Sequence, residues 1–284
     1  MKADKLRTAI IYIIIILLGL ICLLPLLNII AISFSSSAAV EGNMVGLIPV
    51  GFSTAAYEKI LEDSQFWHSF LISVERVVLA LIINFVLIVL MAYPLSKTNA
   101  QFRGRNIYAN LMIFAMLFNG GMIPTFLVVK SYGLLNTVWA LVLAGAGPIL
   151  SVILVMNFFA AVPKELEEAA FIDGANPLQV LTKIFIPISK PVLATVSLFS
   201  IVGSWNDFYS GLIYMSKATY YPLMTYIQSL QINVEDLIKQ GNLSAVVDSA
   251  ALGNTNLNAA KIVVAVIPLL LIYPLLQRYF VSGI

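Results

Sequence analysis

Charged residues are scarce in this sequence. Asp, Glu, Lys and Arg make up 11% of its 284 residues, against about 25% in soluble domains, whereas hydrophobic residues make up 60%. This composition excludes an ordinary soluble domain and predicts an all-α polytopic membrane protein. The formal net charge of +2 is too small to indicate a nucleic-acid partner.

The single cysteine and the single histidine further limit the kinds of site that the chain can form. Cys22 lies inside the first apolar run, so the chain builds neither an internal disulfide framework nor a thiolate metal site. His68 cannot form a multi-histidine site alone, and no Gly-x-x-x-x-Gly-Lys-[Ser/Thr] phosphate loop is present. We therefore expect no catalytic residue, no metal ligand and no cofactor in this chain, and no binding of ATP and Mg²⁺ by a phosphate loop.

Long apolar runs divide the chain into six expected membrane helices. They cover residues 9–32, 66–95, 107–129, 137–161, 191–215 and 259–280, with outer loops over 33–65 and 217–258 and a cytosolic segment over 163–187. The first run is longer than the roughly 7–15 apolar residues of a signal peptide, so we expect a retained helix. Pro268 and Pro274 are expected to break the last helix, and Gly120, Gly121 and Pro124 to kink the third.

Lysine and arginine are distributed unevenly over the expected loops. Ten of the sixteen fall in segments that are cytosolic if the N-terminus is inside: Lys2, Lys5, Arg7, Lys97, Arg103, Arg105, Lys164, Lys183, Lys190 and Arg278. The other six fall on the outer side: Lys59, Arg76, Lys130, Lys217, Lys239 and Lys261. Cytosolic loops are enriched in these residues, so both termini are expected in the cytosol. For Glu75 and Arg76, near a helix end, a local ion pair or snorkelling to the interface is favoured.

The segment 163–187 is polar but has helix-forming signals. Pro163 suits a first helical position, and the glutamates that follow it complement the helix dipole. Gly174 is expected to end this helix in a left-handed conformation. Asn176 and Pro177 then start a second helix, which Pro187 stops. The prediction is two short helices joined by a tight turn, and a partner that binds them.

These residues also carry a family resemblance. Glu168-Ala169-Ala170, three residues, Gly174, nine residues and Ile184-Phe185-Ile186-Pro187 resemble the EAA loop of ABC importer permeases, with Ile186 in place of the usual leucine. The resemblance implies the type I ABC importer permease fold, with the loop seated in a cleft of a cytosolic ATPase. It assigns this coupling to Glu168, Ala169, Ala170, Asp173, Gly174, Ile184 and Pro187. Glu168 could cap the helix locally or pair with an arginine of the partner, and Lys164, four residues earlier, competes for its charge.

Flanking sequence makes the resemblance more specific. Residues 92–97, 122–142, 204–213 and 277–284 resemble carbohydrate-uptake permeases, in particular the shorter permease of the usual pair. This implies a heterodimer with a second homologous permease, two ATPase subunits, an extracytoplasmic solute-binding protein and a carbohydrate substrate, in the bacterial cytoplasmic membrane. Amino acids, peptides or osmolytes are the alternative cargo. An ion-coupled secondary transporter is disfavoured because inverted repeats are lacking and intramembrane acids are scarce.

A polar group of residues falls inside the fifth expected membrane helix. Trp205, Asn206, Asp207 and Tyr209 could line the substrate pathway, or they could form an interhelical hydrogen-bond cluster. Asn84, Asn119 and Asn157 leave the same two interpretations open, and both stay open at this point.

The long outer loop over 217–258 is the remaining candidate for an interaction. It contains Tyr220 and Tyr221 and an amphipathic stretch over 232–238. The resemblance implies contact between this loop and the binding protein, and a plain solvated loop is the alternative.

Overall fold

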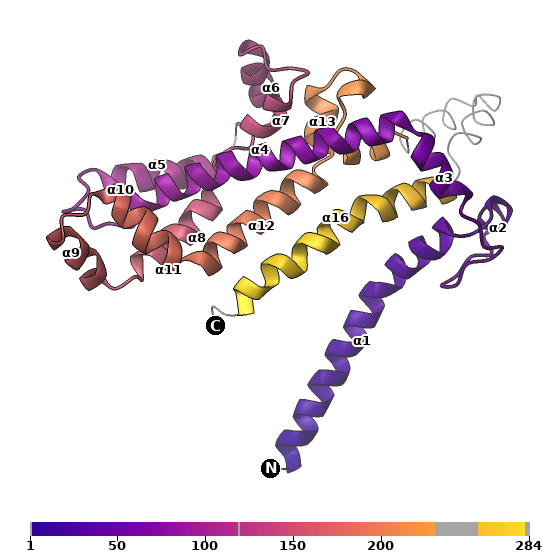
Figure 1. Ribbon diagram of the computed structural model, residues 1–284, viewed down its shortest axis with the longest axis horizontal. Helices are drawn as coiled ribbons and strands as arrows, with labels where there is room; N and C mark the ends of the chain where they lie inside the picture. Colours follow the sequence, from indigo (N-terminus) through magenta and orange to yellow (C-terminus); the bar gives the residue numbers. More distant parts are fainter. Residues whose placement is uncertain (1, 119, 231–254, 282–284) are drawn as a thin grey trace. The chain divides into compact units, whose positions relative to one another are not determined.

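The computed structural model describes residues 2–118, 120–230 and 255–281, and helices with their connections account for all regular structure in these ranges. The chain divides into two compact units, each described by itself. One unit comprises Met1–Trp67 and Tyr226–Ile267; the other, the permeation unit, comprises His68–Thr225 and Pro268–Ile284. The helices α4 (Ser64–Leu95) and α16 (Thr255–Val281) each begin in the first unit and end in the second (Figure 1).

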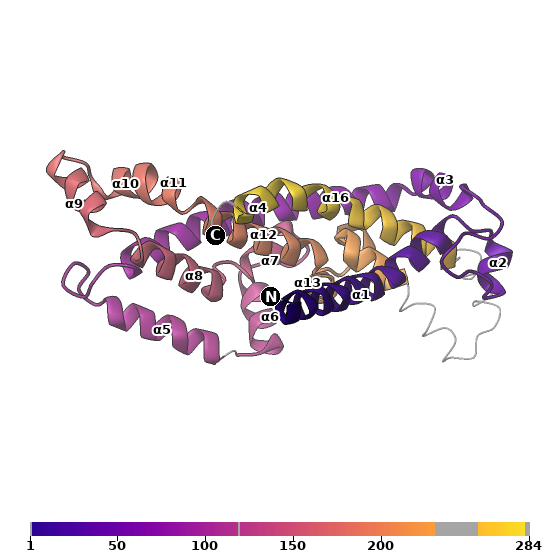
Figure 2. The same cartoon turned by 90° about the horizontal axis from the view of Figure 1, so that it is seen from below.

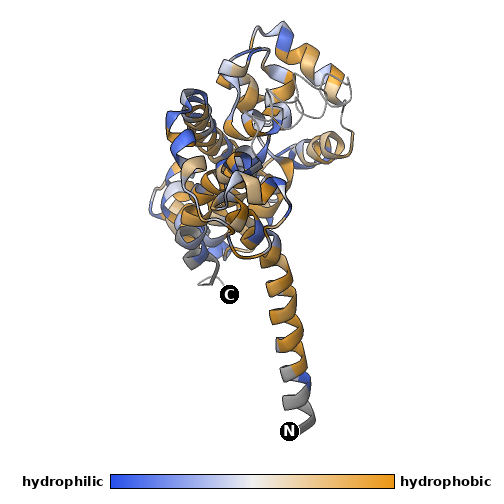
Figure 3. Cartoon of the chain, turned by 90° about the vertical axis from the view of Figure 1, so that its right-hand side faces the viewer, coloured by the Kyte–Doolittle hydropathy of each residue, from blue (hydrophilic) through white to orange (hydrophobic). Residues whose placement is uncertain are grey.

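The first unit holds the N-terminal helices. They are α1 (Lys2–Ser33), α2 (Ser37–Glu41) and α3 (Ala55–Glu62), so the expected outer loop 33–65 contains two short helices. Figure 3 shows that α1 is apolar around its whole circumference, and its side chains from Ile10 to Leu27 are exposed. A helix that is apolar on every side is a membrane helix.

The permeation unit is built from shorter, interrupted helices. Their bounds are α5 (Arg105–Leu117), α6 (Met122–Ser131), α7 (Val138–Leu143), α8 (Ile149–Ala160), α9 (Lys164–Ile172), α10 (Pro177–Val180), α11 (Ile186–Ile188), α12 (Lys190–Asn206) and α13 (Tyr209–Tyr214). Among the described residues, three helices are long and apolar enough to cross a membrane, and up to six spans result if each bent helix pair counts as one.

The interruptions fall where the backbone needs unusual residues. The third expected helix is divided into α5 and α6 near Gly121, which has a φ of +86°. The fourth is divided into α7 and α8 near Gly147, with a φ of +72°. L-residues with a Cβ rarely adopt such angles, so glycine permits both bends. The fifth expected helix is divided into α12 and α13 at Asp207 and Phe208.

The break expected at Pro268 and Pro274 is absent, because α16 is one continuous helix through both prolines. Each proline removes one N–H donor, and helices in membranes tolerate this loss better than helices in water.

Buried apolar side chains hold together the end of the permeation unit that contains the 163–187 segment. Figure 1 shows α12 running beside the second half of α4. The core between them and α8 also includes the second half of the 163–187 segment, and consists of Ile88, Val89, Ala92, Leu95, Val152, Val155, Phe159, Val162, Val180, Leu181, Phe185, Leu193 and Val196.

Asn84 joins three elements of the permeation unit. Its side chain donates to the Ser200 hydroxyl of α12 at 2.9 Å and accepts from the Gly147 amide at 3.0 Å. These two bonds make Asn84 part of an interhelical hydrogen-bond cluster, which is one of the two interpretations that its sequence position allows. Asn157 is exposed, and Asn119 lies outside the described residues.

In the first unit, an ionic cluster joins the end of α3 to α16. Lys261 Nζ lies 2.7 Å from Asp63 Oδ2, and the Tyr226 hydroxyl donates to the same oxygen at 2.9 Å. Burial by itself would raise the pKa of Asp63, but hydrogen bonds from Lys261, the Phe66 amide and Tyr226 outweigh it, so this pKa lies below its ordinary value of 3.8.

We predict that Asp63→Asn lowers the thermal unfolding midpoint of the purified protein in detergent. The substitution leaves Lys261 buried without its carboxylate partner, which costs about 3–5 kcal/mol for fully buried pairs and less here, since Asp63 is partly exposed. The lowered pKa also predicts a pH dependence. The stabilisation by Asp63 is fully present above its unfolded pKa and is lost as the pH falls through the lower folded pKa.

Wild-type midpoints should therefore fall on acidification below about pH 4 by more than those of Asp63→Asn. Glu62→Gln, which changes an exposed neighbouring carboxylate, is the matched control. Equal acid sensitivity of Asp63→Asn and the wild type would contradict the role assigned to this cluster.

Candidate functional site

The segment 163–187 folds as two short helical pieces joined by a turn. Helix α9 ends at Ile172, and Gly174 follows with a φ of +82°. Asn176 caps α10 reciprocally with Gln179: each side chain accepts from the other residue's amide at 2.9 Å. This capping box satisfies two amides at the start of the second helix.

Pro187 does not end the second helix, contrary to the sequence prediction. Leu181–Phe185 form a π-helical turn, and α11 continues through Pro187 to Ile188. In an ordinary α-helix the proline ring would collide with the carbonyl four residues earlier, on Lys183. The wider π turn contains Lys183, so the helix passes the proline without breaking.

Side chains of this segment differ in their surroundings. Val180, Leu181 and Phe185 lie inside the apolar core shared with α4, α8 and α12. Ile172 and Leu178 are instead 86% and 62% exposed. Apolar side chains this exposed outside the expected membrane helices indicate a contact surface for another protein.

Four of the seven predicted coupling residues line one shallow hollow between the two pieces. The hollow has a volume of about 480 Å³, and Ala170, Asp173, Gly174 and Ile184 are among its lining residues. Glu168, Ala169 and Pro187 are exposed outside it. No side-chain hydrogen bond links Glu168 to Lys164 in this fully described helix, so its carboxylate faces solvent.

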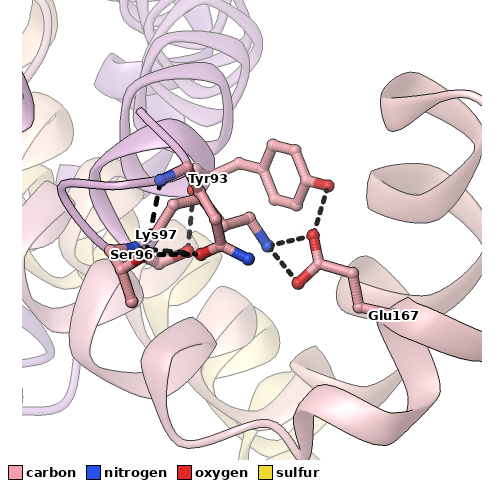
Figure 4. Close-up of polar contacts among 6 residues, drawn as sticks. Tyr93, Ser96, Lys97 and Glu167 are labelled. Carbon is pink, nitrogen blue, oxygen red and sulfur yellow. Dashed lines mark hydrogen bonds and ion pairs between the residues drawn. The ribbon is translucent and has the colours of Figure 1, made fainter. Parts of the chain in front are cut away.

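Glu167, which sequence reasoning passed over, is the buried residue of α9. Its carboxylate lies 2.7 Å from Lys97 Nζ through both oxygens and accepts a hydrogen bond from the Tyr93 hydroxyl at 3.3 Å (Figure 4). Lys97 Nζ also lies 4.1 Å from the centre of the Tyr93 ring and 4.2 Å from that of Phe185. The ammonium thus pairs with one carboxylate and two aromatic faces.

Burial lowers the pKa of Lys97, because the hydrogen bond and charge of Glu167, which act to raise it, only partly offset the loss of water. The side chains of Lys97 and Glu167 are 12% and 11% exposed. The sequence alone does not distinguish Glu167 from the exposed Glu165 and Glu168, because its partner Lys97 lies 70 positions earlier in the chain.

A second polar site lies within the permeation unit. Arg76 is 3% exposed, and instead of pairing locally or reaching the interface it forms an ion pair with Asp207, which follows α12. One guanidinium nitrogen also donates to the Asp207 carbonyl at 2.9 Å. Asp207 Oδ1 accepts from the Ser210 amide at 3.1 Å, which caps the first turn of α13.

This ion pair lines a cavity of about 300 Å³. Other polar side chains around the cavity are Asn84, Ser151, Ser200, Ser204, Ser210 and Tyr214. Of the four residues predicted for a pathway, Asp207 lines this cavity, whereas Trp205 packs edge-on against Phe70 at 5.6 Å. Asn206 is exposed, and the Tyr209 hydroxyl contacts the Met122 sulfur at 3.0 Å.

Comparison with known proteins places the chain in a family. The family model for the binding-protein-dependent transport system inner membrane component matches residues 48–284. The chain belongs to this family. It is thus a permease subunit of an ABC importer, a multi-pass protein of the bacterial inner membrane that works with an ATPase and a solute-binding protein, and ATP is bound by the ATPase.

Three individual proteins are similar to this permease over nearly its whole length. Protein LplC of Bacillus subtilis is 39% identical over 93% of this chain and 88% of its own. The polygalacturonan/rhamnogalacturonan transport system permease protein YtcP of B. subtilis is 38% identical over 99% of this chain and 96% of its own. A crystal structure of a bacterial ABC transporter involved in the import of the acidic polysaccharide alginate matches with a TM-score of 0.86 and 32% identity, covering 99% of this chain and 98% of that one.

Two tyrosines predicted to contact the binding protein lie just after α13 in the permease. Tyr220 is 41% exposed and ends a 3₁₀ turn over Ala218–Tyr220. Tyr221 is partly buried against a small apolar cluster that includes Tyr214 and Met215. The amphipathic stretch over 232–238 lies outside the described residues.

Gly174 offers a direct test of the turn in the 163–187 segment. An added Cβ would meet no atom within 4 Å, so the cost of Gly174→Ala comes from the positive φ alone, about 1–2 kcal/mol. We predict faster amide hydrogen exchange across 163–187 and a slower uptake rate in this variant, with Gly174→Asn closer to the wild type because asparagine tolerates this conformation.

Gly19→Ala is the matched control, because its Cβ also enters open space. Gly19 lies in the middle of α1 and has no positive φ. If both alanine variants show the same exchange and uptake, the turn does not depend on glycine.

Proposed function

We propose that this permease imports an oligosaccharide by ATP-driven alternating access, with the 163–187 segment seated on the ATPase. The observation that carries the proposal is that this segment exposes apolar side chains while its second half is packed into the core of the permeation unit. A segment held this way moves with the membrane helices behind it, as coupling requires.

The oligosaccharide cargo rests on the relatives. YtcP is described as a polygalacturonan/rhamnogalacturonan transport permease, and the structurally similar transporter takes part in alginate import. Both cargoes are polysaccharides or are derived from them. An oligosaccharide is therefore favoured over amino acids, peptides or osmolytes.

The assembly that we propose contains a second, homologous permease, two ATPase subunits and the binding protein. The helix pair at 163–187 would dock in an ATPase cleft through Glu168, Ala169, Ala170, Asp173, Gly174, Ile184 and Pro187. The exposed Glu168 carboxylate is free to pair with a cation of the ATPase. Closure of the ATPases on ATP would draw the coupling segments together and open the permease outward.

Orientation follows from the lysine and arginine distribution, which favours cytosolic N- and C-termini. In the permeation unit, α9 and α10 lie at the same end as the C-terminal end of α4 in both views (Figures 1 and 2). Lys97, Arg103 and Arg105 follow that end of α4. Tyr220 and Tyr221 then belong to the outer side, where we propose that they meet the binding protein.

For the cargo pathway we propose the cavity beside Arg76 and Asp207. A charged pair at membrane depth is expensive unless it is paired or faces water. The charged pair, the hydroxyl side chains and a volume of about 300 Å³ suit hydroxyl groups of a sugar ring. Trp205, Asn206 and Tyr209 remain proposed neighbours of the pathway.

The test is uptake into vesicles that contain the permease with its partners, using trigalacturonate and maltotriose as acidic and neutral probes. We predict ATP-dependent uptake of at least one of them. Arg76→Met with Asp207→Leu removes both charges together, which usually preserves stability. Because the cargo would lose hydrogen bonds to charged groups, uptake should fall about tenfold or more.

Asn157→Leu, a change of an exposed polar residue of α8 outside the cavity, is the control for this double variant. Uptake by the double variant at the rate of this control would remove the cavity from the pathway. Uptake of an amino acid, a dipeptide or glycine betaine in place of both saccharides would contradict the proposed cargo.

A further inference from the structure

Two adjacent glutamates of α9 face in different directions. Glu168 is exposed, whereas Glu167 is 8% exposed. Helix α9 is described over its whole length, Lys164–Ile172, and Glu167 is its one buried residue. The Glu167 carboxylate is therefore the main inward contact of α9, the helix that begins the coupling segment (residues 163–187).

The anchor point for this carboxylate is the end of α4. Lys97 lies two residues after the last residue of α4, and Tyr93 lies in its last turn. Their contacts with Glu167 and with Phe185 of the π turn bring α4, α9 and the second half of the coupling segment together at one ammonium group (Figure 4). Apolar contacts by themselves do not fix the position of one helix relative to another, whereas a carboxylate held through both oxygens does.

Helix α4 carries a second buried ion pair further along. Arg76, on the same helix, pairs with Asp207 at the cavity. From Arg76 to Tyr93 the helix rises by about 25 Å at 1.5 Å per residue. Helix α4 is continuous over this stretch, and its one proline, Pro94, lies in the last turn, where its ring acts on the carbonyl of Leu90.

We propose that Lys97 and Glu167 are positioning residues that transmit movement of the coupling segment to α4, and through α4 to the Arg76–Asp207 pair at the cavity. This inference rests on the coupling role proposed for residues 163–187. A buried ion pair adds little net stability, because the desolvation of its charges offsets their attraction. Its fixed geometry is what distinguishes it from the apolar contacts beside it, since it holds α9 in one position relative to α4.

The experiment compares variants in the assembled transporter, reconstituted in vesicles. Three quantities are measured for each: the amount of ATPase that co-purifies, the thermal unfolding midpoint, and the saccharide imported per ATP hydrolysed. Glu167→Gln and Lys97→Met remove one charge each. Glu165→Gln, an exposed carboxylate of the same helix, is the matched control. Lys97→Arg keeps the charge and can stack between two rings.

We expect Glu167→Gln and Lys97→Met to retain the ATPase and to import about tenfold less saccharide per ATP, within the range by which mutations change coupling between sites. Lys97→Arg should recover most of this loss, and Glu165→Gln should match the wild type. Unchanged import per ATP in Glu167→Gln would overturn the inference. So would a loss of bound ATPase, or a fall in import that simply follows a lower unfolding midpoint, because the pair would then serve the fold alone.

These outcomes are distinct from failure of the proposed function. If the wild-type permease does not co-purify with an ATPase, the coupling role of residues 163–187 is itself wrong. If it does, the ratio of import to hydrolysis reports on Lys97 and Glu167 alone.

Discussion

The structure depends on pairing every charge that leaves water. A charge buried in the protein interior or in the hydrocarbon core has little or no water around it, so it needs a partner within the protein. Charged residues are 11% of the sequence, and in the part of the chain that the structure describes the buried Arg76, Glu167 and Lys261 each have a partner, in the pairs Arg76–Asp207, Lys97–Glu167 and Lys261–Asp63. Each pair joins segments that are far apart along the chain. Pairing therefore also fixes which helices lie together.

The same constraint explains where the helices are interrupted. Backbone groups released at a break need partners, and irregular backbone is tolerated where it lines a cavity. At the break between α7 and α8, the Gly147 amide donates to the Asn84 side chain. At the break after α12, the Asp207 carboxylate accepts from the Ser210 amide in the first turn of α13. Both breaks border the polar cavity. Interrupted helices around a polar space are a means by which transporters form substrate sites.

Local features of the coupling segment could be predicted from sequence, and its long-range contacts could not. The turn at Gly174 and the cap at Asn176 follow from residues within a few positions of each other, and the structure has both. The π turn before Pro187 depends on the core packing of Leu181 and Phe185, which a proline rule does not include. The Glu167–Lys97 and Arg76–Asp207 pairs join residues 70 and 131 positions apart, so they require the helix arrangement to be known first.

The central claim is that the exposed side of residues 163–187 meets the ATPase, and site-specific cross-linking tests it most directly. Cys22 is replaced by serine, and a single cysteine is introduced at Ile172, which is 86% exposed beside the turn. Tyr132→Cys, at a residue 76% exposed on the expected outer side, is the control. We predict that a thiol-to-amine cross-linker joins the Ile172→Cys variant to the ATPase in native membranes, with a yield that changes on ATP addition, and leaves the Tyr132→Cys variant unlinked. Equal yields at the two positions, or none at Ile172, would contradict this account.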